Sequence, residues 1–283
     1  MVKLDNVRKN YGDFSLDISL ELPEGRVSGI VGRNGAGKST TIKAILGLIT
    51  VDSGSVTVFG KDARALTPDD KKRIGVAFSD SGFSNYLSVE DIIRILRNSY
   101  ESFDEAFFRD YCGKNGLPMD KRIKDFSTGM KAKLRVLTAI THNAELLILD
   151  EPTAGLDVVA RNEVLDMLRN YLAEDPKRAL LVSSHISTDL EGLCDDIYMI
   201  SGGKIILHED TDVILGEYAV LKLSRESYRK IDKQYILRTK EESFGYTCFT
   251  NQRKFYAENY PEIVMENGSI DDMIVMMSEG GAE

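Results

Sequence analysis

The chain has 283 residues, of which 42% are hydrophobic and 29% are charged, so it can bury one large core or two unequal ones. Its formal net charge is −9, which argues against a nucleic-acid partner, because nucleic-acid-binding surfaces are basic. No segment approaches the ~18 consecutive apolar residues of a membrane-spanning helix. We expect a cytoplasmic protein without a signal peptide, whose three cysteines are reduced thiols rather than metal ligands: Cys112, Cys194 and Cys248.

The first predicted elements are strands of an antiparallel sheet. Residues 1–5 alternate between apolar and polar side chains, and apolar residues recur at every second position from Phe14 to Leu22. Between these segments, Tyr11 lies in a turn that leaves its ring near the edge of the sheet. The apolar run 27–31 then predicts a short buried strand.

Residues 32–39 match the phosphate-binding pattern G-x-x-x-x-G-K-[ST] at every fixed position. The pattern follows the strand predicted at 27–31 and precedes residues with the apolar spacing of a helix. Glycines let backbone N–H groups surround a phosphate, Lys38 supplies a positive charge, and the Ser39 hydroxyl suits Mg²⁺. The alternative is an ordinary glycine-rich turn, which the flanking strand and helix disfavour. We therefore expect a nucleoside triphosphate site.

Strands and helices alternate along most of the remaining chain. Short strands are predicted at 56–60 and 74–78, and three helices fall between about residues 80 and 140. Apolar strands at 146–149 and 179–183 flank a helix at 158–172, and a hairpin follows. This order predicts an α/β P-loop NTPase core with a mostly parallel sheet, an N-terminal antiparallel β subdomain and a helical insertion at about 80–140.

The pattern changes after residue 216. Short strands are predicted at 220–223, 235–237 and 246–249, and a terminal helix at 269–277 has apolar residues at helical spacing. We predict one domain at 1–216 and a small α+β accessory domain at 217–283. The accessory domain could pair with its copy in a dimer or cover an edge of the main sheet.

Asp150 and Glu151 follow the apolar strand at 146–149. An acid at such a strand end can hold Mg²⁺ through water, and a second carboxylate beside it can polarise an attacking water. The alternative is an acid that only caps the next turn. Together with the phosphate-binding loop, the pair favours triphosphate hydrolysis.

Over about residues 2–210, the chain resembles the ATP-binding subunits of ATP-binding-cassette (ABC) transporters, most closely those of bacterial drug and antibiotic exporters. The motifs occur in the order of the family. Residues 126–130 read Phe-Ser-Thr-Gly-Met where the family usually has Leu-Ser-Gly-Gly-Gln, and residues 183–185 read Ser-Ser-His. The resemblance implies an ATPase that binds ATP and Mg²⁺ as a homodimer or heterodimer. It also implies an integral membrane partner, at the inner face of the cell membrane, contacted through about residues 79–96.

The resemblance also assigns roles to matching residues. Tyr11 stacks on adenine, Glu151 activates water, and His185 contacts the γ-phosphate and orients Glu151. The Mg²⁺ ligands are Ser39 and Asp150. The ATP phosphates bind to Gly32, Arg33, Asn34, Gly35, Ala36, Gly37, Lys38, Ser39 and Thr40. The residues that face the opposite subunit are the signature residues Ser127, Thr128, Gly129 and Met130 and the D-loop residue Asp157.

The chain departs from the family where the glutamine of the Q-loop would fall, near Ser79; the neighbouring Asp80 could replace it. Tyr11 could instead be a core tyrosine and His185 a structural histidine. Two other functions stay open: a soluble ABC-type ATPase that acts on ribosomes or DNA, and a degenerate regulatory cassette. A single cassette, a short insertion and an acidic balance disfavour the first. The second is disfavoured by four intact residues: Lys38, Asp150, Glu151 and His185.

Overall fold

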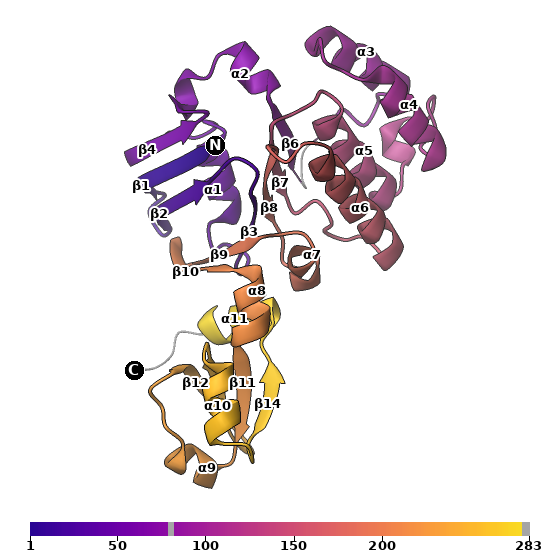
Figure 1. Ribbon diagram of the computed structural model, residues 1–283. Coiled ribbons are helices and arrows are strands. Elements are labelled where there is room, and N and C mark those ends of the chain that lie inside the picture. The colour runs from indigo at the N-terminus through magenta and orange to yellow at the C-terminus, as the bar shows by residue number, and fades with distance from the viewer. Residues whose placement is uncertain (79–81, 279–283) are drawn as a thin grey trace.

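The computed structural model describes residues 1–78 and 82–278. A large sheet with helices on both faces forms one part of the molecule, and a smaller sheet forms the other (Figure 1). The helix α8 (Thr211–Glu217) leads from the large sheet to the smaller one. Ser79 and Asp80, the positions expected to replace the Q-loop glutamine, lie outside the described residues.

The large sheet contains ten strands within the described residues, in the order β5-β4-β1-β2-β10-β9-β3-β8-β7-β6. The pairs among β9, β3, β8, β7 and β6 are parallel, whereas β5, β4, β1 and β2 form an antiparallel half. The strands are β1 (Val2–Asn10), β2 (Ser15–Leu22), β3 (Val27–Val31), β4 (Ser53–Val58), β5 (Lys61–Asp62), β6 (Ile74–Phe78), β7 (Leu146–Asp150), β8 (Ala179–Ser183), β9 (Asp196–Ser201) and β10 (Lys204–Asp210). The expected α/β core and antiparallel N-terminal part are confirmed.

The apolar strand β7 is buried on both faces because successive side chains point to opposite sides of the sheet. Leu146 and Ile148 pack in the same cluster as α1 (Lys38–Ile45) and the N-terminal strands. Leu147 and Leu149 pack on the other face, in the cluster that contains α5 (Thr128–Ile140) and α6 (Val158–Glu174). The two layers hold β7 and its neighbours fixed at the centre of the molecule.

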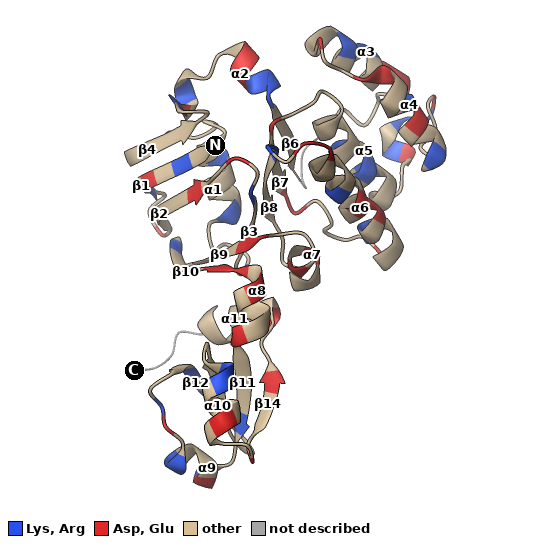
Figure 2. Ribbon diagram, viewed as in Figure 1, with Lys and Arg blue, Asp and Glu red and all other residues tan. Residues whose placement is uncertain are grey.

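The regular elements between residues 82 and 140 are helical. The main helices are α3 (Val89–Ser99), α4 (Glu105–Lys114) and α5, and a 3₁₀ turn lies at Ile123–Asp125. Ser88 and Asp91 form a reciprocal capping box at the start of α3, and Thr67 and Asp70 form one at the start of α2 (Pro68–Lys72). Basic and acidic segments alternate along α3 and α4 (Figure 2), and Arg109 pairs with Glu90 at 2.6 Å.

The smaller sheet has the order β12-β13-β11-β14 and encloses its own apolar cluster. Its elements are β11 (Ala219–Leu223), α9 (Arg225–Lys230), β12 (Ile236–Glu242), β13 (Gly245–Thr250), α10 (Arg253–Asn259), β14 (Val264–Asn267) and α11 (Ile270–Ser278). The sequence patterns missed α9, α10 and β14, which are too short to establish a clear period. The division at residue 216 stays a prediction.

The terminal helix α11 packs on α7 (Ser187–Glu191), which follows β8. Its backbone N–H at Ile270 donates to Glu191 at 3.3 Å. The edges of the large sheet are β5 and β6, so the hypothesis that this part of the chain covers a sheet edge is wrong. The three cysteines are free thiols, as expected, and all are buried.

The packing of α5 on β6 depends on Gly75. A side chain there would place its Cβ 2.1 Å from the Ala139 carbonyl oxygen and 2.6 Å from Leu147 Cδ2. We expect Gly75→Ala to lower the free energy of unfolding by about 1–3 kcal/mol, measured by urea denaturation. Gly113, an exposed glycine in α4 with nothing within 4 Å of a Cβ, is the matched control. Gly113→Ala should raise stability by about 0.5–1 kcal/mol, and equal effects of the two substitutions would contradict this account.

Candidate functional site

The candidate site lies where three parallel strands end at the same edge of the sheet. Ile30 of β3 and Asp150 of β7 both pair in register with Ser183 of β8. The segments that follow these strands therefore start side by side, near α7 in Figure 1. They are the phosphate-binding loop, the acidic pair and the His185 segment, and this edge is where open α/β sheets bind ligands.

Backbone conformation explains the glycines of the loop at 32–39. Gly32 has φ 152, and a Cβ there would lie 2.2 Å from the carbonyl oxygen of Ile200. Gly37 has φ 120 and precedes α1, so its conformation directs the loop into the helix N-terminus. Arg33, Asn34 and Gly35 are exposed at the tip of the loop. The turn thus has the shape that lets backbone N–H groups face an anion.

Lys38 and Ser39 occupy the first turn of α1 and point in different directions. Lys38 is buried, and its Nζ donates to the Gly32 carbonyl oxygen at 2.7 Å and lies 3.6 Å from Glu151 Oε1. Ser39 Oγ donates to Asp150 Oδ2 at 2.7 Å. The first turn therefore contributes a cation on the side of Glu151 and a hydroxyl on the side of Asp150. Thr40 is the next residue in the helix and is half-buried.

Ser183 is a site residue that the sequence analysis did not single out. Its Oγ donates to Asp150 Oδ1 at 2.5 Å and accepts from the backbone N–H of Glu151 at 3.0 Å. These bonds fix the buried carboxylate of Asp150 between α1 and β8. The available signal was the position of Ser183 at the end of an apolar strand, level with Asp150.

Glu151 and His185 form the second contact of the site. Glu151 has φ 53, a left-handed conformation that costs a non-glycine residue about 1–3 kcal/mol. His185 Nδ1 lies 2.5 Å from Glu151 Oε2, and the His185 backbone N–H donates to the same oxygen at 3.3 Å. The carboxylate is mostly buried, whereas the imidazole is exposed. One ring nitrogen thus holds Glu151, and the other makes no hydrogen bond to residues 1–78 or 82–278.

A cavity of about 680 Å³ opens over these groups. Its walls bring together the tip of the loop, Glu151, His185 and three residues of α11. The lining residues are Gly32, Arg33, Asn34, Glu151, Ala154, His185, Asp271, Ile274 and Val275. The sequence predicted the terminal helix but nothing in its spacing placed it beside the phosphate-binding loop.

The remaining predicted site residues do not line this cavity. Tyr11 is exposed and stacks loosely on Phe14, with ring centroids 6.4 Å apart, so the alternative of a core tyrosine is wrong. Ser127 caps α5 by accepting from the Met130 N–H at 3.2 Å, and Asp157 caps α6 by accepting from Ala160 at 2.9 Å. The 127–130 stretch and Asp157 thus belong to neighbouring helix N-termini.

The oxygen atoms of Ser39 and Asp150 fit a magnesium ion that also binds phosphate. Within residues 1–78 and 82–278, no three His, Cys, Asp or Glu side chains are arranged to hold a metal by themselves. Mg²⁺ commonly takes only one or two protein oxygens and completes its shell with phosphates and water. The 2.7 Å bond between Ser39 and Asp150 shows that both oxygens reach one point.

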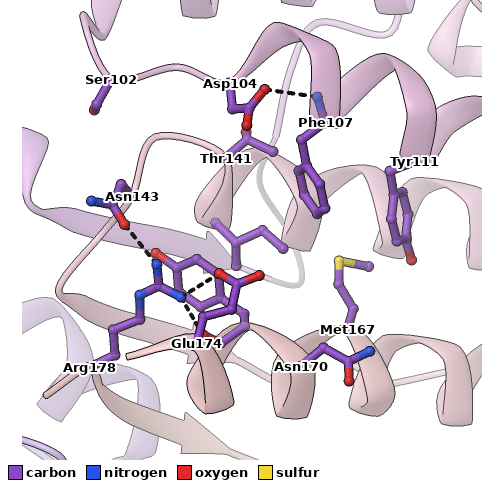
Figure 3. Close-up of a pocket in the computed structure, with 12 residues that line it drawn as sticks. Ser102, Asp104, Phe107, Tyr111, Thr141, Asn143, Met167, Asn170, Glu174 and Arg178 are labelled. Atoms are coloured by element: carbon purple, nitrogen blue, oxygen red, sulfur yellow. Dashed lines mark hydrogen bonds and ion pairs between the residues drawn. The ribbon is translucent and has the colours of Figure 1, made fainter. Parts of the chain in front are cut away.

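A second cavity, of about 350 Å³, lies between α4 and α6 and contains none of the predicted site residues. Figure 3 shows Phe107 and Tyr111 pointing from α4 toward Met167 on α6. At the other end, Arg178 donates to Asn143 at 2.7 Å and to Glu174 at 2.9 Å.

The strand edge, the glycine loop, the lysine and the acidic pair define a P-loop NTPase site. Comparison with known proteins makes the class more specific. A sequence profile of the family described as ABC transporter matches residues 16–154. The lantibiotic transport ATP-binding protein SrtF of Streptococcus pyogenes is 33% identical over 216 residues, covering 75% of this chain and 92% of that protein. The chain belongs to the family of ABC transporter ATP-binding subunits, and it is an ATPase.

Other relatives extend the match. The linearmycin resistance ATP-binding protein LnrL of Bacillus subtilis is 34% identical, covering 73% of this chain and 68% of that protein. The bacitracin transport ATP-binding protein BcrA of Enterococcus faecalis is 28% identical and covers 89% of this chain and 82% of its own length. A solved ATP-binding subunit of an ABC transporter shares the fold, with a TM-score of 0.67 at 24% identity over 76% of this chain and 91% of that one. None of the relatives named here supports the ribosome or DNA alternative.

We expect Ser183→Ala to weaken the site, because it leaves Asp150 Oδ1 buried without its donor. The free energy of unfolding should fall by about 1–3 kcal/mol, and Mg²⁺-dependent ATP turnover should fall about tenfold or more. Ser184→Ala is the control, since the hydroxyl of this buried serine donates to the Ile186 carbonyl oxygen and accepts from the Ile186 N–H instead of contacting Asp150. Colorimetric phosphate release measures turnover, and equal losses in the two variants would contradict the role of Ser183.

Proposed function

We propose that this subunit hydrolyses ATP between two copies arranged head to tail, and that closure and reopening of the dimer power a separate membrane subunit. One observation carries the proposal: Glu151 and His185 line one cavity with the phosphate-binding loop, and Ser127 does not line it. Lys38 Nζ lies 3.6 Å from the Glu151 carboxylate. The site of one chain is half-built, and the signature residues Ser127, Thr128, Gly129 and Met130 of a second copy would complete it.

The arrangement supports a single-step hydrolysis. Glu151 accepts a proton from a water molecule as the oxygen of that water bonds to the γ-phosphorus. The bond from the γ-phosphorus to the bridging oxygen breaks, and ADP leaves with the electron pair. His185 holds Glu151 through Nδ1 and offers its other nitrogen to the γ-phosphate. Lys38 exchanges its bond with the Gly32 carbonyl for the outer phosphates.

Bound Mg²⁺ would supply positive charge to the β- and γ-phosphates. Ser39 and Asp150 are the proposed ligands, and Ser183 keeps the Asp150 carboxylate in place. The loop residues from Gly32 to Thr40 would bind the phosphates through backbone N–H groups and side chains. Tyr11 would offer its exposed ring to adenine, with little discrimination between bases. Asp157 would face the second copy.

An apolar cavity of about 380 Å³ is the proposed docking site of the membrane subunit. It lies between the end of α1, strand β6 and α5, and its wall includes Leu48, which is 62% exposed. Strand β6 ends at Phe78, directly before the segment from Ser79 to Leu96 that the family resemblance assigns to this contact. No helix within the described residues is long and apolar enough to cross a membrane.

The proposed cargo is a drug- or antibiotic-like molecule moved outward. The names of SrtF and BcrA, which concern transport of a lantibiotic and of bacitracin, support this class. The form Ser127-Thr128-Gly129-Met130 also resembles exporter subunits more than importer subunits. We place the subunit in the cytoplasm, attached to the inner face of the cell membrane through its partner.

The catalytic assignment is tested by Glu151→Gln. We expect ATP turnover to fall by about 100-fold or more, ATP affinity to change little, and a dimer to persist in ATP by light scattering. Glu145→Gln is the matched control, because Glu145 precedes the other end of β7 and binds Arg73 instead. Equal turnover by wild type and Glu151→Gln would refute the assigned role of Glu151.

The docking proposal is tested by Leu48→Glu in cells that also express the membrane subunit. A charge in the apolar groove should reduce co-purification of that subunit about tenfold or more, while ATP binding stays unchanged. Val264→Glu, at a 61% exposed position on β14, is the control. Unaltered co-purification of Leu48→Glu would rule out this groove as the contact.

A further inference from the structure

Helix α11 has one buried face and one face open to the ATP cavity. Ile270, Met273 and Met276 are buried in the main apolar cluster. At the intervening helical positions, Asp271, Ile274 and Val275 line the cavity. Val275 is 50% exposed, although the loop and Glu151 lie across the same cavity. The accessory part of the chain therefore presents an apolar surface beside the catalytic groups.

A second exposed apolar pair lies at the start of α6. Val158 and Val159 are 61% and 69% exposed and directly follow Asp157, the cap of that helix. Two adjacent exposed valines at a helix N-terminus bury no core surface in this chain, so they suit a contact between subunits.

The valine pair lies next to the signature residues of its own chain. A Cβ on Gly129 would come within 3.1 Å of Ala160 Cβ, in the first turn of α6. A Cβ on Gly155 would lie 4.0 Å from Thr128 Cγ2. The N-termini of α5 and α6 thus lie against each other. If the signature residues of one copy close on the phosphate-binding loop of another, Val158 and Val159 arrive with them.

We propose that α11 is the docking surface for the N-terminus of α6 from a second copy of this chain. Ile274 and Val275 of one copy cover Val158 and Val159 of the other when the dimer closes on ATP. The proposal rests on the head-to-tail dimer of the proposed function, and it adds α11 to an interface that already includes the loop, the signature residues and Asp157. Helix α11 also packs on α7, which begins just after His185. Closure of the dimer therefore brings the second copy into contact with the accessory domain.

Cross-linking between two proteins, each with one added cysteine, tests the contact. Both carry Glu151→Gln to keep the dimer closed; one carries Val158→Cys and the other Val275→Cys. The natural cysteines are buried and do not compete. Mixed with ATP and a short bis-maleimide, the pair should give a cross-linked dimer that is absent without ATP. The control replaces Val275→Cys with Val264→Cys, at an exposed position on β14.

A second measurement uses charge instead of a cross-link. On the Glu151→Gln background, Val275→Asp should raise the dissociation constant of the ATP-bound dimer about tenfold or more, and Val264→Asp should not. Because Val275 lines the ATP cavity, binding of a fluorescent ATP analogue to each monomer first sets the ATP concentration that saturates every variant, and the dimer dissociation constants are compared at that saturation.

The outcomes separate this inference from the function on which it rests. If the Glu151→Gln parent forms no ATP-dependent dimer, the head-to-tail mechanism and the α11 contact both fail. If the parent forms the dimer but the Val158–Val275 pair cross-links no better than the control, the contact with α11 is overturned and the mechanism stands. The same conclusion follows if Val275→Asp and Val264→Asp dimerise equally well.

Discussion

The buried carboxylate of Asp150 is the constraint on which the rest of the site depends. It accepts one hydrogen bond from Ser39 at the start of α1 and one from Ser183 at the end of β8. A buried charge is tolerated only where such donors surround it. The two bonds therefore tie the phosphate-binding helix to two central strands, and they also leave the acid where a metal ion would meet the phosphates.

Backbone strain is concentrated in Glu151, the residue that follows Asp150. Glu151 adopts a left-handed backbone conformation, held by Ser183 on one side and by His185 on the other. The conformation turns its carboxylate toward Lys38 and the cavity, away from the ladder of β7. The rigid strand edge thus fixes the positions of the two carboxylates, whereas the imidazole of His185 and the tip of the loop are exposed.

Helix α11, from the C-terminal part of the chain, lies beside the candidate site. Helix α11 forms part of the wall of the cavity over the phosphate-binding loop. Its residues lie more than a hundred positions along the chain from that loop and from Glu151. The buried face of α11 belongs to the main apolar cluster, so this helix is held to the core by the same packing that holds α6. The proposed nucleotide site and the proposed dimer contact consequently share one surface with α11.

Local sequence patterns specify the chemistry of the candidate site. The spacing from Gly32 to Ser39, the apolar strand before Asp150 and the capping pair Ser88–Asp91 each specify a structure through neighbours a few residues away. Local patterns do not show which side chains from distant parts of the chain come into contact. Those contacts depend on strand register and helix packing in the folded protein. Ser183 donates a hydrogen bond to Asp150 because the register of β7 and β8 pairs the two residues. Val275 lines the cavity over the phosphate-binding loop because Ile270 and Met273 pack on the core beside α7.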